Sequence, residues 1–253
     1  MTNEGGRATR EYSAGPLALV GSGEYLPVMT DIEAALIAGR SPRYVQIATA
    51  AVPDGPATVE RWHRLGVEQA RRIGVTPVTV PVATREDADD PAVVALIEDA
   101  GLIYLSGGNP NFLAQTLRDT KLWAAIEARW RAGAALAGCS AGAMVMASWV
   151  PTIRHPREGG TPGLALLRHV RVIPHFDAFV KRMPDVATRF LVGHDEDVTV
   201  VGVDEDTAIV GGPEEWVVRG QGSAWILGGA HRQRFDVGDT LRTPITGARA
   251  VGE

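Results

Sequence analysis

Short apolar runs alternate with helical patterns through the first two-thirds of the chain, and this alternation limits the folds that the chain can adopt. Each apolar run is hydrophobic on both faces and ends in small or turn-forming residues, as is typical of a buried strand. Strand–helix alternation predicts a parallel sheet that is covered by helices on both faces. The predicted strands are 16–22, 43–49, 76–82, 102–107 and 134–138, and the predicted helices are approximately 29–39, 56–73, 91–99, 110–117 and 120–132.

The later part of the chain has a different pattern, because its β-rich runs follow one another closely and are separated by tight turns. This spacing predicts antiparallel strands that extend one edge of the same sheet. We therefore expect an α/β fold with a mostly parallel central sheet and an antiparallel extension at one edge. The runs are 170–176, 198–205, 207–212, 215–220 and 223–229.

Chain length and composition favour one large domain. A chain of 253 residues with 45% hydrophobic content can bury a large core as one α/β domain, although this length would also allow two smaller domains. No segment has the length and composition of a linker between domains. We expect a disordered N-terminal tail at 1–15 and a single α/β domain at 16–253.

Charge and cysteine content argue against several classes of function. The net charge is −5 with acidic and basic residues interspersed, so the chain lacks the basic stripe that binds nucleic acid. The single cysteine and the polar N-terminal residues, which lack the apolar core of a secretion signal, predict a cytoplasmic protein. The apolar segment 134–150 is 17 residues long and contains glycines and serines, so we expect no membrane span.

The pentapeptide Gly138-Cys139-Ser140-Ala141-Gly142 lies between a predicted strand and a predicted helix and matches the pattern G-x-S-x-G. In this context the pattern is typical of a nucleophile elbow, in which a strained turn projects the central side chain. The alternative is a closely packed turn without catalytic function. Cys139 is a rival nucleophile, but an elbow centred on it would need glycines where Ala137 and Ala141 stand, so we expect its thiol in the core.

A serine nucleophile needs a base, and six histidines are available. His175 stands apart because it ends the apolar run VRVIPHF, whereas His63 and His231 are expected at the surface. A lone histidine at the end of a strand can also be purely structural. We take His175 as the candidate base.

Two carboxylates compete to orient the base. Glu205 ends another predicted strand, and would lie at the same level of the sheet as His175 if the two strands are parallel. Glu158 lies in the long loop 151–163, and rigid elements hold a triad more accurately than loops do. Glu205 is therefore favoured and Glu158 remains the alternative. Glu205 could also be part of an acidic, solvated turn.

Five segments, taken in order, resemble the serine peptidase family of dipeptidase E and cyanophycinase, a branch of the class-I glutamine-amidotransferase-like superfamily. The segments are GLIYLSGGNPNFLAQTL, AGCSAGAMVMA, PTIR, IPHF and VGVDEDTAIVG. The resemblance implies a flavodoxin-like three-layer sandwich and a homodimer. It further implies a Ser-His-Glu triad at Ser140, His175 and Glu205, and an oxyanion hole made by the backbone N–H groups of Gly108 and Ala141.

The chain departs from the family pattern around the site, which argues against cleavage of cyanophycin. The family often has an aspartate or asparagine followed by glutamine where this chain has Asn109-Pro110, so the glutamine is missing here. Asn109 is a candidate substrate contact. Ile173-Pro174 replaces a polar pair that precedes the histidine. Dipeptidase E selects an N-terminal aspartate, and three cations could pair with such a carboxylate or could be ordinary surface charges. They are Arg154, Lys181 and Arg182.

These residues predict a serine hydrolase that cleaves a small peptide or isopeptide through an acyl-enzyme. No metal or cofactor is expected, since H-E-x-x-H is missing and the segment HDED at 194–197 is interpreted as a solvated turn. Two alternatives remain. One is a noncatalytic protein of the same fold that binds a small molecule, and the other is an esterase or amidase that acts on non-peptide substrates.

Overall fold

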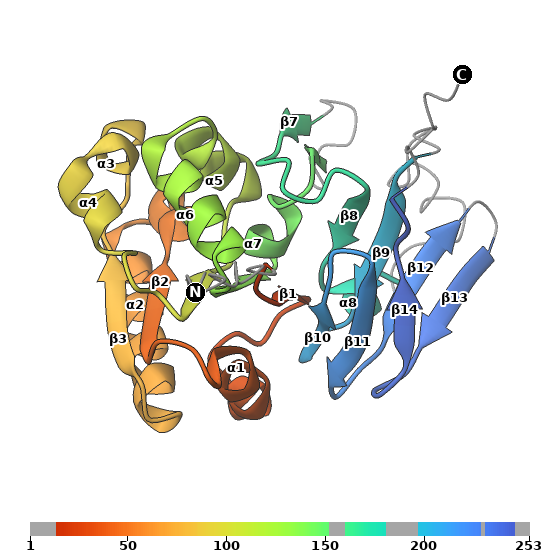
Figure 1. Cartoon of the computed structure of the whole chain (residues 1–253). Helices are drawn as coiled ribbons and strands as arrows, with labels where there is room; N and C mark the ends of the chain where they lie inside the picture. The colour runs from red at the N-terminus through yellow and green to blue at the C-terminus, as the bar shows by residue number, and fades with distance from the viewer. Residues whose placement is uncertain (1–13, 152–159, 181–196, 229–230, 246–253) are drawn as a thin grey trace, which may run out of the picture.

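The computed structural model describes residues 14–151, 160–180, 197–228 and 231–245 (Figure 1). The predicted N-terminal tail therefore falls almost entirely outside the described residues.

An eight-stranded sheet forms the centre of the fold, with the strand order β14-β11-β10-β1-β5-β4-β2-β3. Five of its strands are parallel: β1 (Leu17–Val20), β5 (Ala135–Cys139), β4 (Leu102–Leu105), β2 (Arg43–Ile47) and β3 (Thr76–Val80). The other three extend one edge in antiparallel fashion: β10 (Thr207–Gly211), β11 (Glu215–Gly220) and β14 (Thr240–Arg242). The predicted α/β fold, with its mostly parallel sheet and antiparallel edge, is confirmed.

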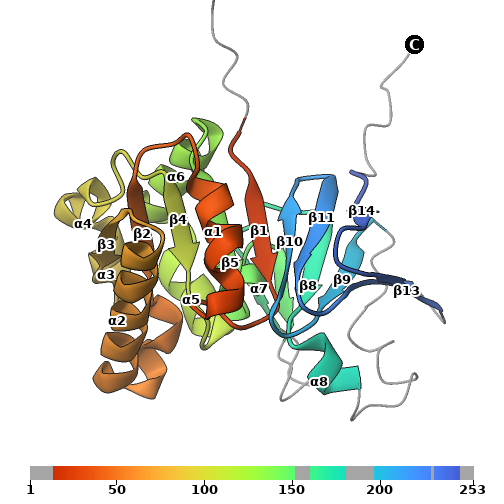
Figure 2. The same cartoon turned by 90° about the horizontal axis from the view of Figure 1, so that it is seen from below.

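Helices cover both faces of this sheet, which makes the three layers seen in Figures 1 and 2. Residues on β1 point alternately to the two sides, so that Leu17 and Leu19 join one hydrophobic cluster while Ala18 and Val20 join the other. A strand that is apolar at every position is therefore buried on both faces. One face is covered by α1 (Thr30–Ile37) and α2 (Pro56–Arg72), and the other by α3 (Arg85–Asp89), α4 (Pro91–Ala95), α5 (Pro110–Leu117), α6 (Lys121–Arg131) and α7 (Ala141–Met144).

A second sheet of four strands, in the order β13-β12-β9-β8, stands beside the antiparallel edge (Figure 1). It consists of β8 (Val170–Ile173), β9 (Thr199–Val203), β12 (Ala224–Gly228) and β13 (His231–Phe235). The prediction that the later strands all extend the central sheet is therefore wrong for 170–176, 198–205 and 223–229. The residue pattern identified strands and turns, but β9 pairs in parallel with β8 and not with β10, which follows it in the chain.

The remaining elements are short. The strands β6 (Trp149–Pro151) and β7 (Gly160–Pro162) form a two-stranded ribbon, and α8 (Phe176–Val180) follows β8 directly. Two short 3-10 helices are η1 (Pro27–Met29) and η2 (Thr49–Asp54). Within the described ranges, no helix is long and apolar enough to cross a bilayer.

Candidate active site

Ser140 lies at the carboxyl end of β5, between this strand and α7. Its backbone has φ 49° and ψ −107°, a conformation that a residue with a side chain rarely adopts. Its backbone N–H donates to the carbonyl of Val20 at 2.9 Å, and its side chain is half-buried. The turn thus presents the hydroxyl at the edge of the sheet where parallel folds commonly bind ligands.

The two glycines of the pentapeptide are required by close packing. A Cβ on Gly138 would come within 2.4 Å of the backbone of Gly142, and a Cβ on Gly142 would lie 2.2 Å from the carbonyl oxygen of Leu105. Contacts this short are not tolerated between heavy atoms. The chain can therefore reverse from β5 into α7 at Ser140 only with glycine at both positions.

Cys139 is fully buried, which confirms the prediction that it belongs to the core. Its thiol donates to Oε2 of Glu24 at 2.8 Å. Burial, and then the nearby Glu24 carboxyl group, raise the pKa of the Cys139 thiol well above its ordinary value. A thiol that stays protonated and has no access to solvent is a poor nucleophile.

Ser140, His175 and Glu205 form a continuous chain of hydrogen bonds. Nε2 of His175 lies 3.1 Å from Oγ of Ser140, and Nδ1 of His175 lies 2.8 Å from Oε1 of Glu205. When Nδ1 carries the proton, it donates to the carboxylate and leaves Nε2 free to accept from the hydroxyl. The geometry therefore allows the hydroxyl to transfer its proton to the imidazole.

The parallel pair β8 and β9 brings His175 and Glu205 together. Ile173 is opposite Gly202 in this pair, and the two side chains follow their strands by two residues each. These strands were expected to be antiparallel extensions of the central sheet, but they pair in parallel within the second sheet, which meets the condition under which Glu205 and His175 lie at the same level. The side chain of His175 is 37% exposed and that of Glu205 is 48% exposed, so the carboxylate of Glu205 lies at the surface.

Asp177 also belongs to this site, although no sequence pattern indicated it. Its Oδ1 accepts the backbone N–H of Glu205 at 3.0 Å. Asp177 follows His175 by two residues at the start of α8, so one short segment carries the imidazole and fixes the backbone of Glu205. The only feature of the sequence that could have indicated Asp177 was its position two residues after His175.

The loop after β4 faces Ser140 and contains Gly107, Gly108 and Asn109. Gly108 has φ 140°, and a Cβ there would lie 2.3 Å from the carbonyl oxygen of Ala50. The backbone N–H of Asn109 donates to the same oxygen at 2.7 Å. Oδ1 of Asn109 accepts the N–H of Phe112 at 3.0 Å, so the observed contact of this predicted substrate residue is a helix cap.

The two amides expected to form an oxyanion hole have no protein acceptor in the described ranges. Neither the N–H of Gly108 nor that of Ala141 donates to a described group, whereas the flanking amides of Gly107, Asn109 and Ser140 are all bonded. Gly107 donates to Oε1 of Glu24 at 2.9 Å. Sequence reasoning missed Glu24, which lies in the loop after β1.

Four predicted site residues lie outside the described residues. They are the alternative triad acid Glu158 and the candidate substrate contacts Arg154, Lys181 and Arg182. Most of the segment HDED, at 194–196, also lies outside them. Among the residues that are described, no three histidine, cysteine, aspartate or glutamate side chains are grouped as a metal site would require.

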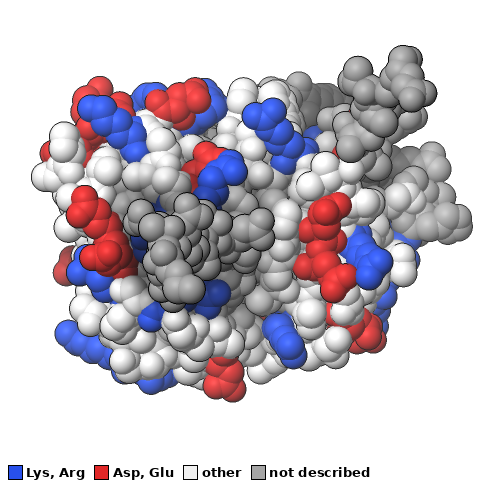
Figure 3. Space-filling model, in the orientation of Figure 1, with Lys and Arg blue, Asp and Glu red and all other residues white. Residues whose placement is uncertain are grey.

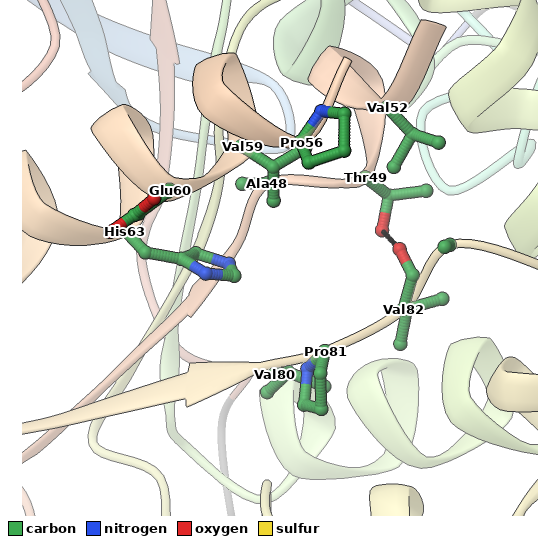
Figure 4. Close-up of a pocket in the computed structure, with 11 residues that line it drawn as sticks. Ala48, Thr49, Val52, Pro56, Val59, Glu60, His63, Val80, Pro81 and Val82 are labelled. Carbon is green, nitrogen blue, oxygen red and sulfur yellow. Dashed lines mark hydrogen bonds between the residues drawn. The ribbon is translucent and has the colours of Figure 1, made fainter.

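A separate apolar cavity of about 480 Å³ opens at the carboxyl ends of β2 and β3 (Figure 4). The elements η2 and α2 line one side of it, and the residues that end β3 line the other. His63, which was expected at the surface, lines this cavity and is partly buried. Burial lowers the pKa of His63, because the cavity wall disfavours the charged imidazole. Gly108 packs against Ala50 of η2 and is not among the residues that line the cavity.

Charged side chains of both signs are interspersed on the face seen in Figure 3, without a continuous basic stripe among the residues coloured there.

Comparison with known proteins gives consistent results. Residues 17–216 match the sequence family described as peptidase family S51. The crystal structure of a peptidase from an acI-B1 actinobacterium is 43% identical, superposes with a TM-score of 0.84, and covers 92% of this chain and 98% of its own. A protein from Listeria monocytogenes EGD-e, provisionally named as peptidase E, is 16% identical, with a TM-score of 0.60, over 82% of this chain and 99% of its own, which supports the fold alone. No curated protein matches the chain significantly.

Proposed function

Because the chain belongs to peptidase family S51 and is a serine-type peptidase, we propose that it cleaves short peptides or isopeptides through an acyl-enzyme formed on Ser140. One observation carries this proposal. Oγ of Ser140, the imidazole of His175 and the carboxylate of Glu205 are joined by hydrogen bonds of 3.1 and 2.8 Å. This is the arrangement that activates a serine hydroxyl.

The reaction proceeds in two halves. In the first, Oγ of Ser140 attacks the scissile carbonyl carbon while Nε2 of His175 accepts the hydroxyl proton. The imidazolium then gives this proton to the leaving amine as the C–N bond breaks, which leaves an ester between the acyl group and Ser140. In the second half, His175 takes a proton from water, the resulting hydroxide attacks the ester, and the proton returns to Oγ.

Glu205 stabilises the imidazolium that forms in each half. Its hydrogen bond to Nδ1 also selects the tautomer in which Nε2 can act as a base. The carboxylate itself takes up no proton, because protons move only between serine, histidine, the leaving amine and water. Glu205 is therefore the triad acid in this proposal.

The N–H groups of Gly108 and Ala141 stabilise the negative charge on the substrate oxygen. Ala141 directly follows Ser140 in the chain, and Gly108 belongs to the loop that faces Ser140. Both N–H groups lack a protein acceptor among the described residues. Donors that are held in place before the reaction stabilise the tetrahedral oxyanion without reorganisation.

The substrate class is a short peptide, with an N-terminal aspartate as the preferred residue. The resemblance to dipeptidase E supports this preference, and Arg154, Lys181 and Arg182 are the candidate partners of the substrate carboxylate. No step of the mechanism requires a metal or a cofactor.

A panel of defined substrates tests the proposal. We would measure hydrolysis of Asp-Leu, Ala-Leu, the isopeptide β-Asp-Leu and p-nitrophenyl acetate by the wild-type chain, Ser140→Ala and the control Ser148→Ala. Among the described residues, the hydroxyl of Ser148 makes no hydrogen bond to Ser140, His175 or Glu205. We expect cleavage of Asp-Leu by the wild type, a loss of at least about 10⁴-fold in Ser140→Ala, and no change in Ser148→Ala.

Two results would contradict the proposal. Peptide cleavage that survives in Ser140→Ala would remove Ser140 as the nucleophile. Hydrolysis of the aryl ester without cleavage of any dipeptide or isopeptide would instead favour an esterase or amidase that acts on other substrates.

A further inference from the structure

The carboxylate of Glu24 bridges two loops of the active site, and the triad does not account for it. Oε1 accepts the backbone N–H of Gly107 at 2.9 Å, and Oε2 accepts the thiol of Cys139 at 2.8 Å. Glu24 is only 8% exposed although its side chain is ionisable. A buried carboxyl group needs hydrogen-bond donors, and here both donors come from the site.

Each residue that Glu24 holds directly precedes a part of the proposed catalytic machinery. Gly107 precedes Gly108, whose amide is one proposed oxyanion donor. Cys139 precedes Ser140, and the other proposed donor, the amide of Ala141, comes next. A single side chain from the loop after β1 thus ties the end of β4 to the end of β5.

The loop at Gly108 is held on its other side as well. The N–H of Asn109 donates to the carbonyl oxygen of Ala50 at 2.7 Å, so the free amide of Gly108 lies between two bonded amides. A Cβ on Gly107 would lie 2.7 Å from Oε1 of Glu24 and 3.5 Å from Cβ of Ser140. This tight packing means that the position of the Glu24 carboxylate sets how closely the loop approaches Ser140.

We infer that Glu24 is a positioning residue for the oxyanion hole, because its carboxylate fixes the Gly107-Gly108 loop relative to the Cys139-Ser140-Ala141 turn. This inference rests on the proposed function, since it assigns the amides of Gly108 and Ala141 to the oxyanion. Oxyanion donors contribute fully only when they are held in place, and a displacement of about 1 Å can cost about 100-fold in rate.

The test compares Glu24→Ala, Glu24→Gln and a matched control, Glu33→Ala. Glu33 is also a buried carboxyl group, 1% exposed, and accepts the hydroxyl of Tyr44 at 2.8 Å, but among the described residues it makes no hydrogen bond to the Gly107-Gly108 loop or to the Cys139-Ser140-Ala141 turn. Both alanine variants therefore remove a buried acceptor, and only one of them removes it from the site. We would measure kcat and KM for Asp-Leu, and inhibition by phenylboronic acid, whose tetrahedral serine adduct mimics the oxyanion.

Glu24→Ala should lower kcat by about 100-fold with KM changed less than about threefold, and should weaken phenylboronic acid inhibition by about tenfold or more. Glu24→Gln should keep kcat within about fivefold of the wild type, since its amide oxygen can still accept the N–H of Gly107. Glu33→Ala should keep kcat within about twofold, whatever its loss of thermal stability. A purely structural role would move the melting temperatures of both alanine variants and leave kcat and inhibition unchanged.

A folded Glu24→Ala variant with wild-type kcat and inhibition would overturn the inference. If Glu24→Ala does not fold, Gly107→Ala decides instead, because its methyl group displaces the loop from Glu24; wild-type kcat in that variant would also overturn the inference. Activity that survives in Ser140→Ala would remove the proposed function itself. An inactive Ser140→Ala beside an unaffected Glu24→Ala would remove only the role of Glu24.

Discussion

The central sheet and the second sheet hold their parts of the active site in different ways. Ser140 and the loop at Gly108 follow buried parallel strands, and packing so close that only glycine fits fixes their backbones. His175 follows β8 and Glu205 follows β9, which are neighbouring strands of the smaller, four-stranded sheet. Both side chains are more than one-third exposed and are held by side-chain hydrogen bonds. The proposed nucleophile is thus held by backbone geometry, and the proposed base and acid are held by polar contacts.

This difference has a consequence for variants. Polar contacts at an exposed position contribute little to folding, so changes in the second sheet should alter activity with little effect on stability. Changes to buried groups that pack against the central sheet should alter stability with little effect on activity. The predictions below test this contrast, beginning with the largest expected effect.

Two histidines next to the second sheet should separate activity from stability. His175→Asn removes the base, while asparagine tolerates the φ of 51° at this position. We expect kcat/KM for Asp-Leu to fall about 10⁴-fold with the melting temperature nearly unchanged. The control is His169→Asn, since His169 is 8% exposed and its Nε2 lies 2.9 Å from the carbonyl oxygen of Pro213.

His169→Asn should keep kcat/KM within about twofold of the wild type and lower the free energy of unfolding by about 1 kcal/mol. Equal losses of activity in the two variants would show that the second sheet contributes only support for the fold. Thermal melts and steady-state kinetics on both proteins distinguish these results.

The acid and its support should give graded losses. Glu205→Gln cannot stabilise the imidazolium and favours the wrong tautomer, so kcat should fall about 10³-fold or more. Asp177→Ala removes only the acceptor of the Glu205 N–H, and a slightly displaced carboxylate should cost about tenfold. Steady-state kinetics check both values. An Asp177→Ala variant that is less active than Glu205→Gln would argue for a direct role of Asp177.

A buried carboxyl group beneath the central sheet should make stability depend on pH. Burial raises the pKa of Glu33 from its ordinary 4.5 to about 7, chiefly because the charged form loses its hydration. The folded chain therefore holds this proton more tightly than the unfolded chain, and stability falls as pH rises from 4.5 through 7. The pKa difference corresponds to about 3 kcal/mol at most.

Urea unfolding of the wild type and Glu33→Gln at pH 5 and pH 8 measures this effect. The wild type should lose up to about 3 kcal/mol more than the variant on going to pH 8. An identical pH dependence in the two proteins would show that Glu33 does not titrate in this range.

The sequence predicted the central sheet well and the second sheet poorly. Strands buried on both faces leave a continuous apolar run, so the order of strands and helices in the central sheet was readable, and the pentapeptide at Ser140 located its sharpest turn. The second sheet was missed because residue patterns identify strands but not their partners. β9 is followed closely by β10, yet it pairs with β8 and β12.

The supporting residues of the site could not be read from local patterns. Glu24 is separated by 83 residues from Gly107 and by 115 from Cys139, so only the folded chain brings these groups together. Asp177 reaches Glu205 across 28 residues, and the two follow different strands of the second sheet, β8 and β9. Contacts of this kind depend on how helices, strands and loops pack together, whereas local sequence patterns predict each element separately.

Labelling with a fluorophosphonate tests the central claim most directly, because only an activated serine reacts readily with it. The account predicts one label per chain, located at Ser140 by peptide mass spectrometry, no label in Ser140→Ala, and much slower labelling in His175→Asn. Stoichiometric labelling of a different serine, or of none in a folded chain that cleaves Asp-Leu, would contradict it.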